Sequence, residues 1–192
     1  DSFPIIIGRG VFRELEAVLN TYPEKSIFII CDSYFNNYSL NFREEVRIIS
    51  KYKHFYIDGG IESKVLSNYQ IILDLLIDNK IKKDGVIVAI GGGVIGDLSA
   101  FVASTYQRGI DLIQVPTTTT AMIDSAVGGK TGLNYLNQVN LIGTYFNPKA
   151  IFMDLEFLLT LNYRDYFSGV CESIKMAITS DNIMFNRLFE LS

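Results

Sequence analysis

The most constraining feature of the sequence is a run of three glycines between two apolar segments. The apolar run 86–90 predicts a buried strand, Gly91, Gly92 and Gly93 follow it, and the apolar run 98–103 predicts a buried helix. Glycines at such a turn let the backbone bend sharply and approach a ligand with no Cβ in the way. The free N–H groups at the start of the next helix favour an anion such as a pyrophosphate. From the spacing alone, a nucleotide site and a tight turn without a ligand both stay open.

The composition describes a chain that can bury a large core. Of its 192 residues 48% are hydrophobic, the formal net charge is −4 and the pI is about 5.0. Nucleic-acid-binding surfaces are usually basic, so this charge argues against a nucleic-acid partner. Cys31 and Cys171 are too few and too far apart for a disulfide framework, and we expect reduced thiols in a cytoplasmic protein. We expect no membrane association, because no apolar run approaches the roughly 18 residues that span a bilayer and no secretory pattern opens the chain.

Strand and helix patterns alternate along most of the chain. Short apolar runs predict strands at 4–7, 26–31, 55–57, 86–90, 112–115 and 150–153. Helical patterns cover 11–19, 40–49 and 65–77. This alternation predicts an α/β fold, a Rossmann-like and largely parallel sheet with flanking helices, whose ligand lies beyond the carboxyl ends of the strands.

The pattern changes after residue 154. Strand signals stop there, and a helical pattern over 164–191 runs toward the last residues without a Gly or Pro stop signal. We therefore expect two units, an α/β domain over 1–154 and the start of a truncated helical domain over 155–192.

Polar groups follow the predicted strand 112–115 and the turn after it. Thr117 and Thr118 end that strand, where hydroxyls either bond the phosphate or ribose oxygens of a ligand or cap the next helix. Lys130 follows a glycine pair, which suits a bound anion, although a solvated lysine on a surface loop also explains it. Both interpretations stay open for each segment.

A glutamate and a lysine share one face of the predicted C-terminal helix. Glu172 and Lys175 lie three residues apart, the spacing of an ordinary surface ion pair. Their flanking residues are apolar, so a pair that points into a cleft between two domains is the alternative. His54 is the only histidine, and we interpret it as structural or exposed. Catalytic metal sites typically use three protein ligands, often histidines, so this chain alone does not supply one from histidine.

Taken in order, these motifs resemble the 3-dehydroquinate synthase family of sugar phosphate cyclases. The matching segments are 91–97 (GGGVIGD), 105–109 (TYQRG), 114–118 (QVPTT), 124–131 (DSAVGGKT), 140–143 (NLIG), 148–150 (PKA) and 172–175 (ESIK). The resemblance covers nearly the whole chain. It implies an NAD-binding α/β domain, followed by the beginning of a helical domain that supplies two histidine metal ligands and the rest of the substrate site.

The same resemblance implies roles residue by residue. It assigns NAD binding to Asp32, Lys64, Gly91, Gly92, Gly93, Asp97, Thr117 and Thr118. It assigns the substrate site to Asp124, Lys130, Asn140 and Lys175, with Arg108 reaching the substrate phosphate across a dimer interface. Glu172 would be the one metal ligand in this chain, for zinc or cobalt.

The implied activity is that of a lyase of the shikimate pathway, which leads to the aromatic amino acids. The substrate would be 3-deoxy-D-arabino-heptulosonate 7-phosphate and the products 3-dehydroquinate and phosphate. A hydroxyl is transiently oxidised by NAD, phosphate is eliminated, the hydride returns and an intramolecular aldol addition closes the ring. We expect a cytoplasmic homodimer, and we expect the isolated 192-residue chain to be inactive because it lacks the histidine ligands.

Two positions depart from the pattern of that family. Ile61 stands where the family has a glutamate, and Val139 stands where it has a lysine. Each lost charge-assisted hydrogen bond would weaken NAD binding by roughly 1.5–3 kcal/mol. Three alternatives follow: a cyclase that acts on another sugar phosphate, a metal-dependent polyol dehydrogenase of the glycerol dehydrogenase type, and a non-catalytic nucleotide-binding module. The retained Asp124, Lys130 and Lys175 argue against the last.

Overall fold

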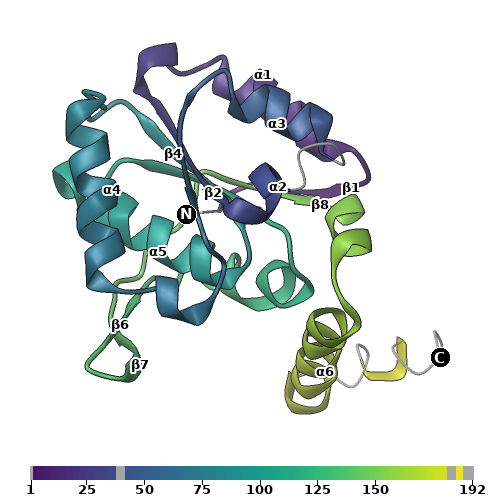
Figure 1. The fold of residues 1–192 in the computed structure, drawn as a ribbon. Coiled ribbons are helices and arrows are strands. Elements are labelled where there is room, and N and C mark those ends of the chain that lie inside the picture. Colours follow the sequence, from purple (N-terminus) through teal and green to yellow (C-terminus); the bar gives the residue numbers. More distant parts are fainter. Residues whose placement is uncertain (1, 38–41, 181–184, 188–192) are drawn as a thin grey trace.

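The computed structural model describes residues 2–37, 42–180 and 185–187, and its centre is a six-stranded sheet (Figure 1). The strand order is β1–β8–β5–β4–β2–β3, and every pairing in this sheet is parallel. The strands are β1 (Ile5–Gly8), β2 (Ile27–Asp32), β3 (Lys53–Ile57), β4 (Val86–Gly91), β5 (Asp111–Pro116) and β8 (Ala150–Asp154). The predicted α/β fold with a largely parallel sheet is confirmed, and all six expected strands are present.

Helices cover both faces of the sheet (Figure 1). One face carries η1 (Val11–Glu14), α1 (Leu15–Leu19), α2 (Ser33–Asn37) and α3 (Arg43–Ile49), and the other carries α4 (Leu66–Asp78) and α5 (Gly93–Thr105). The helix expected over 11–19 therefore begins as a 3₁₀ turn. Of the helix expected over 40–49, residues 40 and 41 lie outside the described part of the chain, and the rest begins at Arg43.

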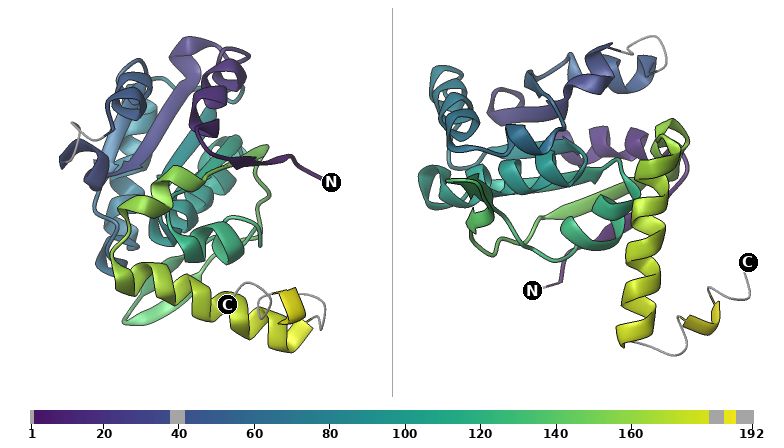
Figure 2. Two further views of the ribbon diagram at one scale, coloured as in Figure 1. Left: turned by 90° about the vertical axis from the view of Figure 1, so that its right-hand side faces the viewer. Right: turned by 60° about the horizontal axis from the view of Figure 1, so that its bottom comes forward.

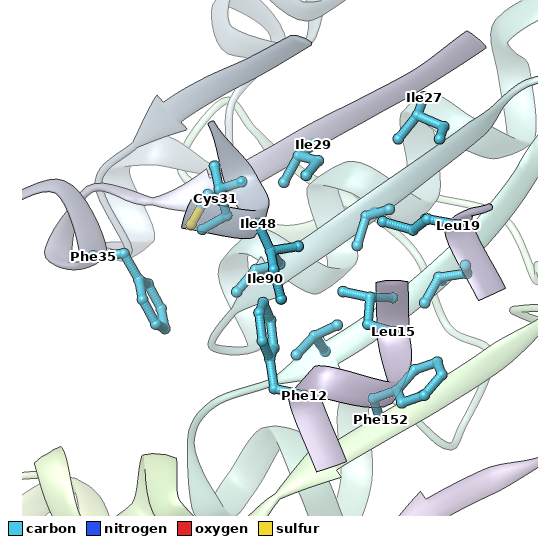
Figure 3. Close-up of a cluster of buried hydrophobic side chains, with 14 of the residues drawn as sticks. Phe12, Leu15, Leu19, Ile27, Ile29, Cys31, Phe35, Ile48, Ile90 and Phe152 are labelled. Carbon is cyan, nitrogen blue, oxygen red and sulfur yellow. The ribbon is translucent and has the colours of Figure 1, made fainter. Parts of the chain in front are cut away.

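Successive residues of the central strands pack on opposite faces of the sheet. In β2, Ile27, Ile29 and Cys31 join the cluster beneath α1 and α3, which Figure 3 shows, whereas Phe28 and Ile30 join the cluster beneath α4 and α5. A parallel strand buried on both faces needs apolar residues at every position. This is why these strands are unbroken apolar runs in the sequence instead of alternating ones.

The order of the strands opens a crevice between the carboxyl ends of β2 and β4. From β2 the chain adds β3 on one side, whereas from β4 it adds β5 and then β8 on the other. The connections therefore leave these two strands in opposite directions, the arrangement at which open α/β sheets bind ligands. Asp32 ends β2 and Gly91 ends β4, so two residues that the sequence predicted for NAD lie beside this crevice.

The sequence patterns missed an antiparallel hairpin between β5 and β8. It consists of β6 (Leu133–Tyr135) and β7 (Gln138–Ile142), joined by Leu136 and Asn137 with φ angles of 46° and 61°. Two consecutive positive φ angles are those of a type I′ turn, which Asn-Gly normally signals. A leucine at the first turn position concealed that signal, and β7 is exposed along most of its length, so no buried face marks it either.

After β8 the chain forms η6 (Leu155–Thr160) and α6 (Tyr163–Ser180), and Figure 2 shows α6 leading away from the sheet. Phe157 of η6 packs in the core of the α/β unit, with its ring centroid 5.8 Å from that of Phe12 and 5.5 Å from that of Phe35. The division into domains at residue 154 stays a prediction. Of the helix expected over 164–191, residues 181–184 and 188–191 lie outside the described part. None of the described helices is both long and apolar enough to cross a membrane.

Asp154 ties the beginning of the chain to the end of the sheet. Its carboxylate is buried and accepts three backbone N–H bonds of 3.0 Å, from Gly10 and Glu156 on Oδ1 and from Phe12 on Oδ2. One carboxylate thus caps both η1 and η6.

We expect Asp154→Asn to lower the free energy of unfolding by about 1–3 kcal/mol, because an amide nitrogen would face one of the N–H donors and leave it unsatisfied. Urea denaturation measures the change. The exposed Asp84→Asn, which makes the same change of charge, should stay within about 0.5 kcal/mol of the parent. Equal stability of the two variants would contradict the capping role.

Candidate cofactor and substrate site

The three glycines form the turn from β4 into α5 beside the crevice. Gly92 is the N-cap of α5, and a Cβ on it would lie 3.2 Å from Cγ2 of Thr118. A Cβ on Gly93 would lie 3.1 Å from Oγ of Ser125. None of the three has a positive φ angle, so these glycines are needed for close approach and not for a left-handed backbone. The first turn of α5 directs its free N–H groups toward the same place.

A hollow of about 350 Å³ lies along the crevice. Its walls include Asp32, Gly59, Gly92, Thr117 and Thr118 from the sheet edge, and Thr160, Leu161, Asn162 and Asp165 from the segment after β8. A hollow of this size and mixed lining is typical of small-molecule sites. The predicted positions Asp32, Gly92, Thr117 and Thr118 are therefore brought together in one place.

The residues 160–165 on this wall were not predicted from the sequence. No strand end or glycine marks them, and only a helix-capping pattern could have drawn attention to the segment. Oδ1 of Asn162 accepts the backbone N–H of Asp165 at 2.9 Å, which is the bond of an N-terminal cap. Such a cap at the start of a helix indicates a turn near the ligand but no particular chemistry.

Asp32 uses one carboxylate oxygen for the fold and leaves the other beside a glycine. Oδ1 accepts the backbone N–H of Tyr34 at 3.0 Å, whereas a Cβ on Gly59 would collide with Oδ2. Burial raises the pKa of Asp32 and the charge of Asp58 raises it further, while the Tyr34 N–H opposes both. Gly59 therefore lets Oδ2 reach the hollow on a side where any larger residue would block it.

Thr117 and Thr118, which both line the first hollow, make different hydrogen bonds. Oγ1 of Thr118 accepts the backbone N–H of Ala121 at 3.2 Å and so caps the π-helical turn η5 (Ala121–Ser125). Thr117 is buried, and its backbone N–H donates to the carbonyl of Gly91 at 3.0 Å. The capping interpretation is thus correct for Thr118, which also lines the hollow, so the two interpretations do not exclude each other.

A second hollow, of about 410 Å³, lies beyond α5 and brings together four predicted positions. Its walls include Asp97, Asp124, Lys130 and Asn140. Asp124 belongs to the π-helical turn η5, and Nζ of Lys130 lies 3.8 Å from its Oδ1. The Lys130 side chain is 65% exposed and that of Asp124 41%, so they form an open rim with charges of both signs that a polar ligand can reach.

Lys64 connects the two sets of predicted residues. Its side chain is only 6% exposed; the ammonium forms an ion pair with Asp97 and donates to Oδ1 of Asn140 at 2.5 Å. Burial raises the pKa of Asp97, with the Lys64 ammonium opposing that shift. One buried cation thus holds a carboxylate of the predicted NAD group and an amide of the predicted substrate group in the same network.

Arg108 is not brought to this place within one chain. It is exposed and follows α5 just before β5 begins, so it lies at the amino edge of a parallel sheet whose carboxyl edge carries the hollows. A contribution from Arg108 to the site of a second copy stays a prediction.

Glu172 and Lys175 form an ion pair on α6, and the Lys175 side chain is 64% exposed. Of the two interpretations of this pair, the structure therefore supports an ordinary ion pair on the helix surface. Gly169, one turn before them, is buried, and a Cβ on it would collide with Thr119, so α6 lies directly against the turn after β5. Among the residues that the structure describes, no group of three His, Cys, Asp or Glu side chains is placed to hold a metal ion.

The two departures from the family pattern lie on one surface hollow. Ile61 and Val139 both line a space of about 370 Å³ between the 3₁₀ turn η3 (Ile61–Ser63) and the hairpin. Their exposed fractions are 58% and 62%. The lost glutamate and the lost lysine therefore concern one location, next to Lys64, and not two independent ones.

Comparison with known proteins gives a consistent result. A model of the 3-dehydroquinate synthase N-terminal domain matches residues 54–168. The 3-dehydroquinate synthase of Alkaliphilus oremlandii is 41% identical over 94% of this chain and 50% of its own length. The chain thus spans about half the length of the curated relatives it matches.

Solved structures share the fold. A 2-epi-5-epi-valiolone synthase from Streptomyces hygroscopicus with NAD⁺ and Zn²⁺ bound superposes with a TM-score of 0.83 at 25% identity, covering 97% of this chain and 52% of its own. A 2-deoxy-scyllo-inosose synthase complexed with carbaglucose-6-phosphate, NAD⁺ and Co²⁺ has a TM-score of 0.74 at 30% identity, covering 90% of this chain and 47% of its own. With the family model matched over more than half its residues, the chain belongs to the 3-dehydroquinate synthase family.

Proposed function

We propose that this chain is the NAD-binding part of a 3-dehydroquinate synthase that converts 3-deoxy-D-arabino-heptulosonate 7-phosphate to 3-dehydroquinate and phosphate. The observation that carries the proposal is the buried network of Lys64, Asp97 and Asn140. It joins two residues predicted for the cofactor to one predicted for the substrate, and Asp97 and Asn140 both lie on the wall of the second hollow. The identity of 41% to the synthase of Alkaliphilus oremlandii supports the substrate over that of the less similar cyclases.

The first hollow fits NAD. The start of α5 offers N–H groups and a positive dipole end to the pyrophosphate, and Gly92 and Gly93 let it approach. Oδ2 of Asp32 would accept from the adenosine ribose hydroxyls. Thr117, Thr118 and the Lys64–Asp97 pair would contact the rest of the cofactor, which supplies reversible hydride transfer when bound.

The second hollow would take the sugar acid phosphate. Lys130, and Lys175 from α6, would neutralise the carboxylate and phosphate, while Asp124 and Asn140 would hold hydroxyl groups. Arg108 would reach the phosphate from the second copy of a cytoplasmic homodimer. Glu172 would be one ligand of a zinc or cobalt ion, which polarises oxygen atoms as a Lewis acid; the described residues do not complete that site.

The full-length protein tests the proposal directly. A synthase releases phosphate from the heptulosonate phosphate without net accumulation of NADH. A polyol dehydrogenase would accumulate NADH from glycerol, and a different cyclase would release phosphate faster from another sugar phosphate, such as a hexose 6-phosphate. Either of these results would replace the proposed function.

We expect Asp32→Asn to weaken NAD binding by about tenfold or more. The amide keeps an acceptor for the Tyr34 N–H but removes the charge from the oxygen that faces the ribose, and a charge-assisted hydrogen bond contributes roughly 1.5–3 kcal/mol. Calorimetric titration with NAD measures the change. The matched control is Asp58→Asn, a neighbouring carboxylate that is bonded to Ser33, and its NAD affinity should stay near that of the parent. Equal affinities of the two variants would refute the role of Asp32.

We expect the double variant Ile61→Glu with Val139→Lys to bind NAD more tightly than the parent by about a hundredfold or more, because two charge-assisted hydrogen bonds would be restored. Because the two positions share one hollow, each new charge should be partnered by the other. The gain in NAD affinity of the double variant should therefore exceed the product of the gains of the two single variants. NAD titration of all four proteins gives the coupling. Ile77→Glu on α4, an equally exposed isoleucine, controls for added charge alone. Strict additivity would show that the two positions act separately.

We expect residues 1–192 on their own to bind NAD but to release no phosphate from the heptulosonate phosphate. The described residues supply one predicted metal ligand, and His54 is the only histidine. A phosphate-release assay with added Zn²⁺ or Co²⁺ checks this expectation, with the full-length protein as the positive control. Measurable turnover by the 192-residue chain would contradict it.

A further inference from the structure

We propose that Asn134 is the positioning residue that holds Lys64 and Asn140 in their functional arrangement. It lies in β6 of the hairpin, at the irregularity in register between Leu133 and Tyr135. The proposal rests on the proposed function only for its kinetic consequence. The contacts themselves are a property of the fold.

Asn134 makes three hydrogen bonds in two directions. Its backbone N–H donates to the carbonyl of Lys64 at 2.8 Å, and its Nδ2 donates to the carbonyl of Ile61 at 3.2 Å. Its Oδ1 accepts the backbone N–H of Asn140 at 3.0 Å. The amide side chain thus uses both ends, one on the turn that carries Lys64 and one on the strand that carries Asn140.

Asn140 requires such support because its backbone is left-handed. Its φ angle is 56°, a conformation that non-glycine residues adopt at a cost, although asparagine tolerates it better than most. The N–H bond to Asn134 fixes this backbone, and the Asn140 side chain then points its Oδ1 at the ammonium of Lys64. The bond to Asn134 within the hairpin therefore sets the backbone conformation of Asn140, and that conformation places its side chain against Lys64.

Lys64 is held at the same time through its main chain. Asn134 bonds its carbonyl, and the neighbouring Val65 forms an isolated parallel bridge with Asn134. The lysine side chain is buried, so a small displacement of its backbone alters the geometry of both its bonds, to Asp97 and to Asn140. A single residue of the hairpin thus holds the backbone of a buried cation and that of an amide on the wall of the second hollow.

Only asparagine among the common side chains supplies this pair of bonds at this length. Aspartate keeps the acceptor for the Asn140 N–H but presents a carboxylate to the carbonyl of Ile61. Leucine has a similar volume and makes neither bond. These two substitutions therefore separate the two ends of the amide.

The test compares Asn134→Leu and Asn134→Asp with the parent in the full-length protein. The control is Asn137→Asp, which makes the same chemical change in the turn of the same hairpin, where the left-handed backbone accepts aspartate. For each protein we would measure the NAD Kd, kcat and KM for the heptulosonate phosphate, the midpoint of thermal unfolding, and hydrogen exchange at the backbone amide of Asn140.

We expect Asn134→Leu to raise the NAD Kd and to lower kcat each by about tenfold, while Asn137→Asp changes neither. Exchange at the Asn140 amide should quicken in Asn134→Leu and stay near the parent rate in Asn134→Asp, which keeps the acceptor. A merely structural role would lower the unfolding midpoint and leave Kd and kcat of the folded protein, assayed well below that midpoint, within twofold of the parent. That result would overturn the proposal.

If Asn134→Leu does not fold, the NAD Kd of Asn134→Asp tests the proposal instead. A Kd within twofold of the parent value overturns it. If the parent itself neither binds NAD nor releases phosphate, the proposed function has failed. The exchange rate at Asn140 then tests the positioning role alone, and an unchanged rate in a folded Asn134→Leu protein overturns it.

Discussion

Burial of the parallel sheet on both faces is the constraint on which the rest of the molecule depends. Helices occupy the two faces, so strands such as β2 and β4 carry apolar residues at every position and have no room for polar chemistry along their length. The polar side chains that accompany these two strands therefore lie where the strands end. Because the strands are parallel, one edge collects all of their carboxyl ends, and the divergence of the chain from β2 and β4 opens the crevice there.

The buried ammonium of Lys64 then organises that edge. Removing a lysine from water is costly unless charged and polar groups replace the solvent. Asp97 comes from α5 and Asn140 from β7, so the partners of one cation belong to a core helix and to an exposed hairpin. The hairpin, whose strand β7 is largely exposed, is thereby joined to helix α5 of the core.

The sequence predicted those features that local chemistry determines. Apolar runs located the six strands, and the glycines after residue 90 located the turn between Gly91 and Gly93. Features that depend on distant contacts could not be found in this way: the type I′ turn at Leu136 needs a conformation that leucine seldom adopts, and the wall formed by Thr160 and Asn162 exists only because η6 folds back on the core. The placement of Arg108 at the opposite edge likewise follows from strand direction and not from its own motif.

The location of Ile61 and Val139 shows where such a site can change at little cost. Both positions lie on an exposed rim, where replacing one partner of an ion pair alters stability by roughly 0–1 kcal/mol. Lys64 lies a few residues away but is buried, and deleting one partner of a buried pair costs about 3–5 kcal/mol because the other charge is left uncompensated. The same charge-to-apolar exchange is therefore tolerated by the fold at the rim and not in the network beneath it. For that reason we expect substitutions that change ligand affinity among related proteins to occur at the rim, while the Lys64 network keeps its geometry.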